Sequence, residues 1–334
     1  MHLGLSTIGR RLAPDDLRRT ARLAESLGYD SLWTAEGWGA DAFTPLGFIA
    51  ATTSRLRLGT AIAQITARTP AATAMTALTL QQLSGGRLLL GLGVSGPRVV
   101  EGWHGVPFRR PLAATRDYVA VVRQALAAEA EVQHAGEIYC VPYRGEGATG
   151  LGDPLRSALP AAPETPILVA ALGPRNAALA AEIADGLLPY LWSPSHWHRA
   201  WGEALAAAPE GFHVAPTVVA ALGDDLAACR DEVRPRNALS HRRAWDRRTR
   251  TFYKALVVRY GYEAEAESIQ SRFLAGDRAG AIAAVGDALV DELALVGPPG
   301  HIADQLDAWR QCPIDTLIVE PTRDDAIVTQ AELW

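Results

Sequence analysis

Residues 85–105 read GGRLLLGLGVSGPRVVEGWHG and contain a G-x-G-x-x-G sequence, Gly91–Gly96, directly after an apolar run. This pattern is typical of the first turn of a dinucleotide-binding Rossmann fold, where the last glycine leads into a helix and an acid follows about 20 residues later at the end of the next strand. Here an irregular stretch beginning at Pro97 follows the motif, and the acid at that distance, Asp117, lies in a helical pattern. The context therefore disfavours a dinucleotide site, and the glycines need another explanation.

The chain on both sides of this stretch alternates short apolar runs with amphipathic segments, which is the pattern of repeated β-α units and a parallel sheet. Several runs consist almost entirely of Val, Ile and Leu, as expected for strands buried on both faces. The expected strands lie at residues 2–6, 30–35, 56–62, 87–93, 165–173, 186–191, 213–222 and 315–321. Eight such strands predict an α/β fold, a single (β/α)8 TIM barrel with insertions that spans residues 1–334 as one domain. A doubly wound open sheet is the alternative.

Residues with strong positional preferences support this order of elements. The helical segment 69–86 begins with Thr69-Pro70 and ends with Gly85-Gly86. Proline is favoured in the first helical turn and glycine just beyond the last. Two stretches interrupt the alternation: residues 128–163 predict a hairpin followed by a Gly- and Pro-rich loop, and residues 225–292 predict a helical insertion.

Composition and charge favour a small-molecule partner. The formal net charge of -5 provides no positive field for nucleic acid or an anionic membrane, both of which are bound largely through phosphate neutralisation. The cysteines Cys140, Cys229 and Cys312 are widely spaced and odd in number, which indicates reduced, buried thiols rather than a disulfide framework or a zinc site. The sequence shows no secretory leader and no apolar run of about 18 residues, so we expect a cytoplasmic protein.

Small residues gather where three of the expected strands end. They are Gly59-Thr60-Ala61, Gly93–Gly96 and Ala171-Leu172-Gly173. The active site of a (β/α)8 barrel is built from the loops at the carboxyl ends of its strands, and small residues let the backbone approach a planar ligand. Tight strand-to-helix turns favour glycine for structural reasons as well, so this pattern alone leaves both explanations open.

Residues 24–97, which run from AESLGYDSLW to GLGVSGP, resemble the luciferase-like superfamily of flavin and deazaflavin barrels, and in particular its branch that uses the deazaflavin coenzyme F420. The resemblance resumes at 165–186, TPILVAALGPRNAALAAEIADG, and at 295–319, LVGPPGHIADQLDAWRQCPIDTLIV. It therefore covers most of the chain. It implies the bacterial luciferase-like form of the TIM barrel.

The resemblance also implies a coenzyme site. The family places a non-prolyl cis peptide bond behind the coenzyme ring, and the matching bond is Ala61-Ile62. The family places the coenzyme phosphate at the helix after strand five, where unpaired N–H groups favour an anion. The residues that the resemblance assigns to the coenzyme are Ala61, Ile62, Gln64, Gly93, Val94, Ser95, Ala171, Leu172, Gly173, Pro174 and Arg175.

Two departures limit what the resemblance implies about substrate. Sugar-phosphate dehydrogenases of this group carry a His directly after the acid of strand two, but Gly37 follows Glu36 here. The methylenetetrahydromethanopterin reductases place a Glu in the first strand, and this chain offers only Ser6 and Thr7. Neither substrate is therefore supported.

Hydride transfer to or from a deazaflavin requires one proton to move, so a proton donor should lie at the strand ends. The candidate catalytic residues are Glu36, His104 and Tyr190, with Glu101 as a further polar residue nearby. Each has an alternative: Glu36 as an acceptor that orients the ligand, Glu101 and His104 as loop surface, and Tyr190 as an amphipathic wall.

Two further patterns carry less information. His196-Trp-His198 opens a helix, where residues two apart point in different directions, so we expect no metal site. Residues 234–250, RPRNALSHRRAWDRRTR, hold seven arginines and one acid, Asp246. This segment indicates a solvated helix face, or alternatively a surface that meets the oligoglutamate tail of the coenzyme or an acidic or peptide substrate.

The sequence thus predicts an F420-dependent oxidoreductase that transfers a hydride between reduced deazaflavin and a small organic or natural-product substrate with an activated C=C, C=N or alcohol group. One alternative is a monooxygenase that uses reduced FMN from a partner reductase. Another is a flavin-binding barrel without catalysis. A peptide substrate is compatible with the sequence, and the resemblance implies a homodimer.

Overall fold

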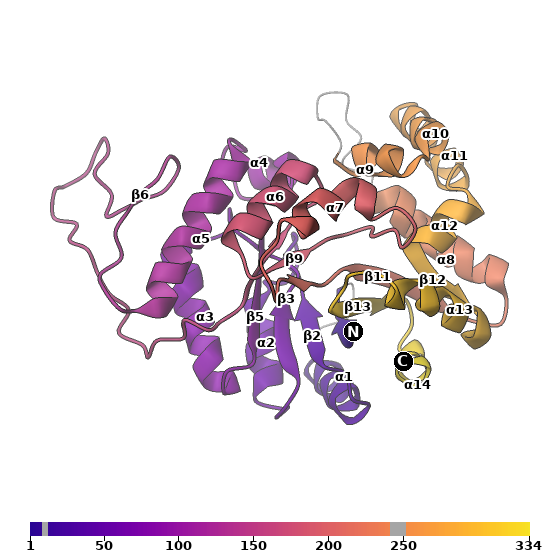
Figure 1. Ribbon diagram of the computed structural model, residues 1–334, viewed down its shortest axis with the longest axis horizontal. Coiled ribbons are helices and arrows are strands. Elements are labelled where there is room, and N and C mark those ends of the chain that lie inside the picture. The colour runs from indigo at the N-terminus through magenta and orange to yellow at the C-terminus, as the bar shows by residue number, and fades with distance from the viewer. Residues whose placement is uncertain (9–12, 241–251) are drawn as a thin grey trace.

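The computed structural model describes residues 1–8, 13–240 and 252–334, and its main feature is one large parallel sheet with helices around it (Figure 1). The strands of this sheet are β1 (His2–Ser6), β2 (Ser31–Thr34), β3 (Arg57–Thr60), β4 (Ala63–Gln64), β5 (Leu88–Gly93), β8 (Ile167–Ala170), β9 (Gly186–Leu188), β10 (His213–Val214), β11 (Thr217–Leu222), β12 (Ala294–Gly297) and β13 (Thr316–Pro321). Their order is β10-β9-β8-β5-β3-β2-β1-β13-β11-β12, with β4 attached to β5.

The sheet closes between β10, at one end of this order, and β11, which is next to the other end, because only Ala215 and Pro216 separate these two strands. The Ala215 N–H donates to the Leu187 carbonyl at 2.9 Å, and Tyr190 forms a parallel bridge with Thr217. β10 and β11 thus act as one strand that is interrupted at Pro216, which has no N–H to donate to the ladder. The sheet closes into a (β/α)8 TIM barrel, and the eight strands predicted from the sequence are confirmed.

Helices cover the outside of the barrel. They are α1 (Pro14–Ser26), α2 (Phe43–Ala50), α3 (Pro70–Ser84), α5 (Pro111–Ala127), α6 (Pro174–Ile183), α7 (His198–Ala206), α13 (Pro299–Arg310) and α14 (Ala326–Leu333). The ends of α3 are those predicted: the Thr69 side chain accepts a hydrogen bond from the Ala72 N–H at 3.2 Å, and Gly85 takes the left-handed conformation with φ 68°.

Two elements differ from the prediction. Pro97–Gly102 forms a short helix, α4, where the sequence suggests an irregular stretch, because proline is well suited to the first helical position. The prediction of an irregular stretch after Gly96 is therefore wrong, because Gly91–Gly96 leads directly into a helix, as it would in a dinucleotide site. The closed barrel excludes the Rossmann fold instead, since that fold is an open sheet. The eight expected strands also do not include β12, which pairs with β11.

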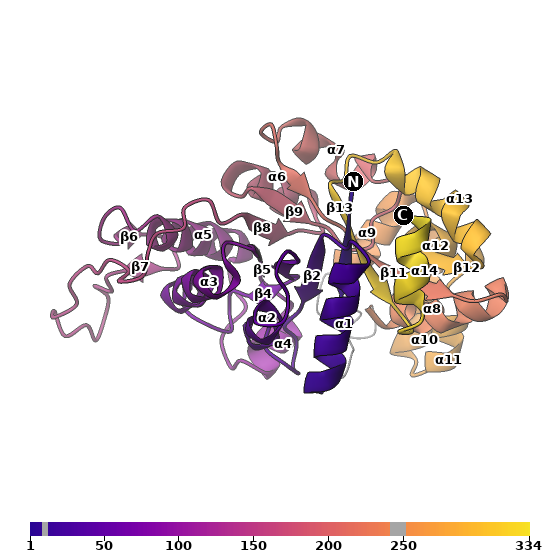
Figure 2. The ribbon, with the colours of Figure 1, turned by 90° about the horizontal axis from the view of Figure 1, so that it is seen from below.

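Residues 128–163, which we call the arm, project from the barrel beyond α5 (Figures 1 and 2). The predicted hairpin is present as β6 (His134–Ala135) and β7 (Cys140–Val141), which pair in antiparallel fashion. The remainder of the arm, up to β8, contains no helix or strand.

Asp117 of α5 holds the base of the arm. Its carboxylate accepts hydrogen bonds from the Ile138 N–H at 2.6 Å and the Tyr139 N–H at 3.1 Å, and it lies 3.1 Å from His134 Nε2. Burial by itself raises the pKa of Asp117, but these hydrogen bonds outweigh it and hold the pKa below its usual value.

In the segment predicted as a helical insertion, the described residues form five helices: α8 (Leu226–Ser240), α9 (Phe252–Tyr260), α10 (Glu263–Leu274), α11 (Arg278–Ala283) and α12 (Asp287–Leu293). Most of the arginine-rich segment, residues 241–250 with Asp246, lies outside the described residues. The assignment of the whole chain to one domain stays a prediction.

Apolar side chains fill the inside of the barrel. They are Trp33, Leu89, Leu168, Leu188, Ala215 and Ile318, from six different strands or their connections. Gly59 is required beside them, because a Cβ at this position would lie 2.1 Å from the Trp33 ring. Since the interior is filled, a ligand must bind at the strand ends rather than within the barrel.

The cysteines and the helix lengths bear on two expectations from the sequence, reduced thiols and the absence of a membrane span. All three cysteines are free thiols, and Cys229 and Cys312 are buried as predicted, but the prediction is wrong for Cys140, which is exposed on the hairpin of the arm. Across residues 1–8, 13–240 and 252–334, none of the helices combines the length and the apolar character that crossing a membrane would require.

Candidate active site

The carboxyl ends of β3, β5 and β8 lie next to one another in the sheet, so the predicted coenzyme residues gather at one edge of the barrel. The Ala61-Ile62 peptide bond is cis, as predicted. After it the chain returns to the sheet: Gln64 pairs in register with Gly93, and the Ile65 N–H donates to the Gly93 carbonyl at 3.0 Å.

Glycine at position 93 leaves room for the Ile62 side chain in this arrangement. A Cβ on Gly93 would lie 2.4 Å from Cδ1 of Ile62 and 3.2 Å from Cβ of Ala170. The next residues turn sharply away, with Ser95 in the left-handed conformation at φ 59°. The cis bond and the end of β5 are thus packed directly against each other, at the position where the sequence places the coenzyme ring.

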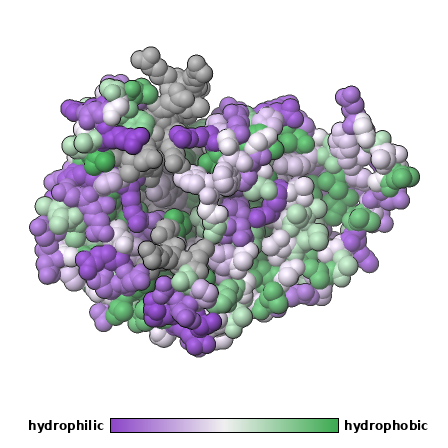
Figure 3. Space-filling model, turned by 180° about the vertical axis from the view of Figure 1, so that it is seen from behind, coloured by the Kyte–Doolittle hydropathy of each residue, from purple (hydrophilic) through white to green (hydrophobic). Residues whose placement is uncertain are grey.

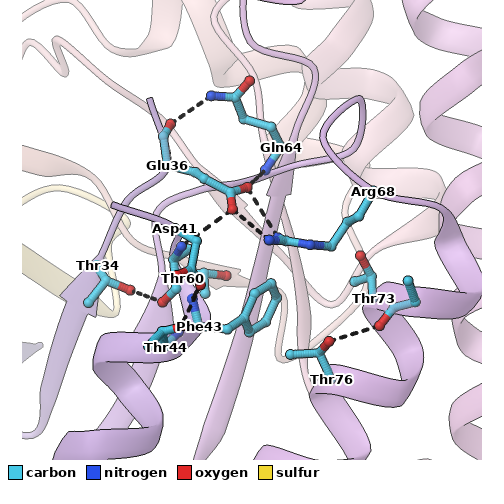
Figure 4. Close-up of polar contacts among 12 residues, drawn as sticks. Thr34, Glu36, Asp41, Phe43, Thr44, Thr60, Gln64, Arg68, Thr73 and Thr76 are labelled. Carbon is cyan, nitrogen blue, oxygen red and sulfur yellow. Dashed lines mark hydrogen bonds and ion pairs between the residues drawn. The ribbon is translucent and has the colours of Figure 1, made fainter. Parts of the chain in front are cut away.

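Glu36 follows β2 and is tied to this segment through its backbone and its side chain (Figure 4). The Glu36 N–H donates to the Ile62 carbonyl at 3.0 Å, and the carboxylate accepts from the Gln64 backbone N–H at 2.8 Å. The carboxylate also meets the Arg68 guanidinium at 2.8 and 3.2 Å, and its side chain is only 6% exposed. These contacts favour a role in positioning the cis segment over the predicted role in proton transfer.

Arg68 is a residue that the sequence reasoning missed. Its guanidinium lies 4.8 Å from the centre of the Phe43 ring while it pairs with Glu36. A signal was available, because Arg68 is the sole charged residue between Arg57 and Arg87. A lone charge in a long uncharged stretch indicates a specific partner, although the sequence does not say which one.

His104 lies just after α4, and its ring contacts the same segment. Nε2 of His104 is 3.1 Å from Oε1 of Gln64, and the His104 N–H donates to the Val99 carbonyl at 3.1 Å. The ring is partly buried. Glu101, in contrast, is exposed and accepts a hydrogen bond from the Phe108 N–H at 3.2 Å. Of these two polar residues, the structure brings His104 to the site.

Tyr190 lies at the end of β9, where it forms the bridge with Thr217 that closes the barrel. Its ring is partly buried and meets the Tyr253 ring edge to face, with the ring centres 6.1 Å apart. This packing fits the predicted alternative of an amphipathic wall.

The start of α6 fits a phosphate. Gly173 is extended at the N-cap and no side chain caps the helix, so the N–H groups of the first turn face outward. Arg175 in that turn is exposed and forms no ion pair with any described residue. It lines a groove of about 490 Å³ between α5 and α6, together with the charged residues Arg116, Asp117, Glu137 and Glu182. The groove is lined by three acids and two arginines, so only Arg175 and the uncapped start of α6 favour an anion here.

His196, where the sequence predicts no metal site, contacts two polar side chains. Its Nδ1 is 3.1 Å from the Ser193 hydroxyl and 3.6 Å from the Glu292 carboxylate. Within the described parts of the chain, no group of three or more His, Cys, Asp or Glu side chains is arranged to hold a metal ion.

Similarity to known proteins extends over most of the chain. The family model described as luciferase-like monooxygenase matches residues 1–316. The chain belongs to the luciferase-like monooxygenase family. This luciferase-like protein is 40% identical over 315 residues to a Mycobacterium tuberculosis protein whose name proposes it as a coenzyme F420-dependent oxidoreductase, and the match covers 92% of this chain and 90% of the relative.

Two further matches cover nearly the whole luciferase-like chain. A 5,10-methylenetetrahydromethanopterin reductase of Archaeoglobus fulgidus is 27% identical over 328 residues, which is 93% of this chain and 92% of that protein. The solved structure of the coenzyme F420 dependent tetrahydromethanopterin reductase from Methanopyrus kandleri has a TM-score of 0.79 at 21% identity, and covers 99% of this chain and 97% of its own. The last match shows the fold alone. With this family membership, we assign the protein to the oxidoreductases.

Proposed function

We propose that this luciferase-like protein uses coenzyme F420 to transfer a hydride to or from a small organic or natural-product substrate. The observation that carries the proposal is the pairing of the cis Ala61-Ile62 bond with Gly93 at the strand ends, together with the uncapped start of α6 and its Arg175. A flat surface and an anion site on adjacent strands suit a ring that carries a phosphate tail. The F420 relative at 40% identity supports the same coenzyme.

In this proposal each group of residues at the strand ends has its own role. Ile62, Gly93, Val94 and Ser95 line one face of the ring. The phosphate binds at Pro174 and Arg175, directly after the backbone of Ala171–Gly173. The Glu36–Arg68 pair and Gln64 keep the cis segment in place. When bound, F420 supplies or accepts a hydride at a ring carbon. His104 holds or takes the accompanying proton, and Tyr190 forms part of the wall.

The test is a side-by-side titration of the purified protein with F420 and with FMN, followed by fluorescence of the ring. We expect micromolar binding of F420 and much weaker binding of FMN. The alternative is a monooxygenase that takes reduced FMN from a partner reductase, which the description of the family favours. Preference for FMN would establish that alternative, and F420 binding without turnover of any C=C, C=N or alcohol substrate would leave a binding protein.

We also propose that two copies associate through α3. The stretch 69–86 contains no charged residue, and Met75 and Leu83 on α3 are 64% and 66% exposed. Figure 3 shows apolar surface on the half of the molecule that carries the arm. Exposed apolar helix faces of this kind mark interfaces between chains. The proposed assembly is a symmetric homodimer that works in the cytoplasm on a small-molecule or peptide substrate.

A further inference from the structure

The Gln64 side chain is buried beside the cis segment, with the whole residue only 1% exposed. Its Nε2 lies 2.8 Å from the carbonyl oxygen of Glu36 and 3.3 Å from that of Gly37. Both partners are acceptors, so the nitrogen of the amide must face them. The opposite orientation would place Oε1 against two carbonyl oxygens. The oxygen of the Gln64 amide therefore faces the His104 ring.

This orientation determines which ring nitrogen of His104 carries the proton. Oε1 of Gln64 can only accept a hydrogen bond, and it lies 3.1 Å from Nε2 of His104. A neutral imidazole has one N–H, so Nε2 carries it and Nδ1 holds the lone pair. No group in the described part of the chain forms a hydrogen bond with Nδ1.

Gln64 is itself held by its surroundings. Its backbone N–H donates to the Glu36 carboxylate at 2.8 Å, and that carboxylate is clamped by Arg68. His104 is anchored through its backbone at the end of α4. The Gln64 amide and the His104 ring are therefore each held in place by contacts other than the one between them.

We propose that Gln64 is a positioning residue that keeps neutral His104 in the tautomer with the proton on Nε2, so that Nδ1 is the atom that exchanges a proton with substrate. The substrate part of this inference rests on the proposed F420-dependent function, whereas the tautomer part does not.

The proton balance follows from the geometry. In the reducing direction, bound reduced F420 would supply a hydride to one atom of a C=C, C=N or C=O group, and the electron pair of the π bond would move to the other atom. That atom would take the proton from Nδ1 of the His104 imidazolium, whose N–H bond would break. The ring is left neutral with its proton on Nε2, in the hydrogen bond with Gln64, so no rearrangement is needed. In the oxidising direction each step is reversed.

The test uses the full-length protein with ¹⁵N-labelled histidine and without coenzyme. Long-range ¹H–¹⁵N spectra, recorded at a pH where the ring is neutral, report the tautomer, and the H104N variant identifies the His104 signals. In wild type we expect the Nε2–H form. In the nearly isosteric Q64M variant we expect the ratio of Nε2–H to Nδ1–H to fall about fivefold, as expected for the loss of one neutral hydrogen bond. The intrinsic preference of imidazole for one tautomer is the same in wild type and in Q64M, so it cancels when the two tautomer ratios are compared.

Gln81 provides the matched control. It is also a buried amide, 6% exposed, and its Nε2 donates to the Thr165 hydroxyl at 2.8 Å in another part of the barrel. Q81M should lower stability as Q64M does but leave the His104 signals unchanged, so general loosening of the fold is separated from loss of the specific contact.

Two results would overturn the proposal: a dominant Nδ1–H form in wild type, or an unchanged tautomer ratio in Q64M. If F420 does not bind at all, the spectra still decide the Gln64–His104 relationship, and the proposed function fails separately. With a turnover assay in hand, Q64M should lower kcat and shift the pH dependence of kcat/KM, whereas Q81M should shift neither.

Discussion

The Glu36 carboxylate and the Arg68 guanidinium meet through two hydrogen bonds, of 2.8 and 3.2 Å, with side chains that are 6% and 21% exposed. The pair joins the loop after β2 to the segment between β4 and α3 (Figure 4). Because the same carboxylate accepts from the Gln64 N–H, the pair also supports the chain just beyond the cis bond. The acid at the end of strand two is therefore part of the framework of the site.

Replacing Arg68 should destabilise the protein strongly. R68M leaves the Glu36 carboxylate buried without its counter-ion, and we expect the free energy of unfolding to fall by about 3 kcal/mol, because removing one partner of a buried pair is costly. The double variant R68M/E36Q should recover part of this loss. Denaturation by urea measures both values. As a control, E182Q removes the exposed pair with Arg116 and should have no measurable effect. Equal effects of R68M and E182Q would contradict this assignment.

A methyl group at position 93 should disturb the coenzyme site. In G93A the new Cβ would meet Ile62 Cδ1 at 2.4 Å, and Ile62 must shift away from its place beside the cis bond. We expect weaker F420 binding and a loss of about 1–3 kcal/mol in stability, as is typical of overpacking. In G96A the Cβ would meet no atom within 4 Å, and the backbone is extended, so this variant is the control. Unchanged F420 binding in G93A would remove Ile62 from the ring site.

Arg175 should contribute to binding of the coenzyme phosphate. R175Q is expected to raise the Kd for F420 about tenfold, the effect of losing one charge-assisted hydrogen bond. A deazaflavin that lacks the phosphate should bind wild type and R175Q equally. R55Q changes an exposed arginine just before β3, at the opposite end of the barrel, and should leave both titrations unaltered. If R175Q weakened both ligands equally, the phosphate would lie elsewhere.

His213 should make stability depend on pH. Burial lowers the pKa of His213 below its ordinary value of 6.5, and Nε2 lies 3.0 Å from the Thr316 hydroxyl. The unfolded chain therefore binds the proton more readily than the folded one, so stability is complete above pH 6.5 and falls as the pH drops below 6.5 toward the folded pKa. Thermal unfolding between pH 7.5 and about 5 should show a steeper loss for wild type than for H213Q. Parallel curves would show that His213 does not titrate on unfolding.

The proposed dimer can be tested on α3. M75E/L83E places two carboxylates on the exposed apolar face, and we expect light scattering to show a monomer where wild type is a dimer. V328E is the control, because Val328 is also an exposed apolar residue, 37% exposed, on α14. A dimer that survives M75E/L83E would place the interface on another face.

The sequence predicted the barrel well because its signals are local. Thr69 and Gly85 mark the ends of α3 through their own backbone and side-chain preferences, and the strands are continuous apolar runs. The errors are local as well: the sequence around Pro97 lacks a long apolar repeat, so a helix of one or two turns was missed. The cis Ala61-Ile62 bond was expected from the family resemblance and is present.

The amino-acid sequence by itself determined the order of the β-α units and the strand ends at which the site is built, because helix caps, glycines and apolar runs act over a few residues. Only the tertiary structure decided what the polar side chains at those ends do. Glu36 and Arg68 are 32 residues apart, and Gln64 and His104 are 40 apart. Contacts of this kind arise when closure of the barrel brings neighbouring strand ends together, and no local preference encodes them.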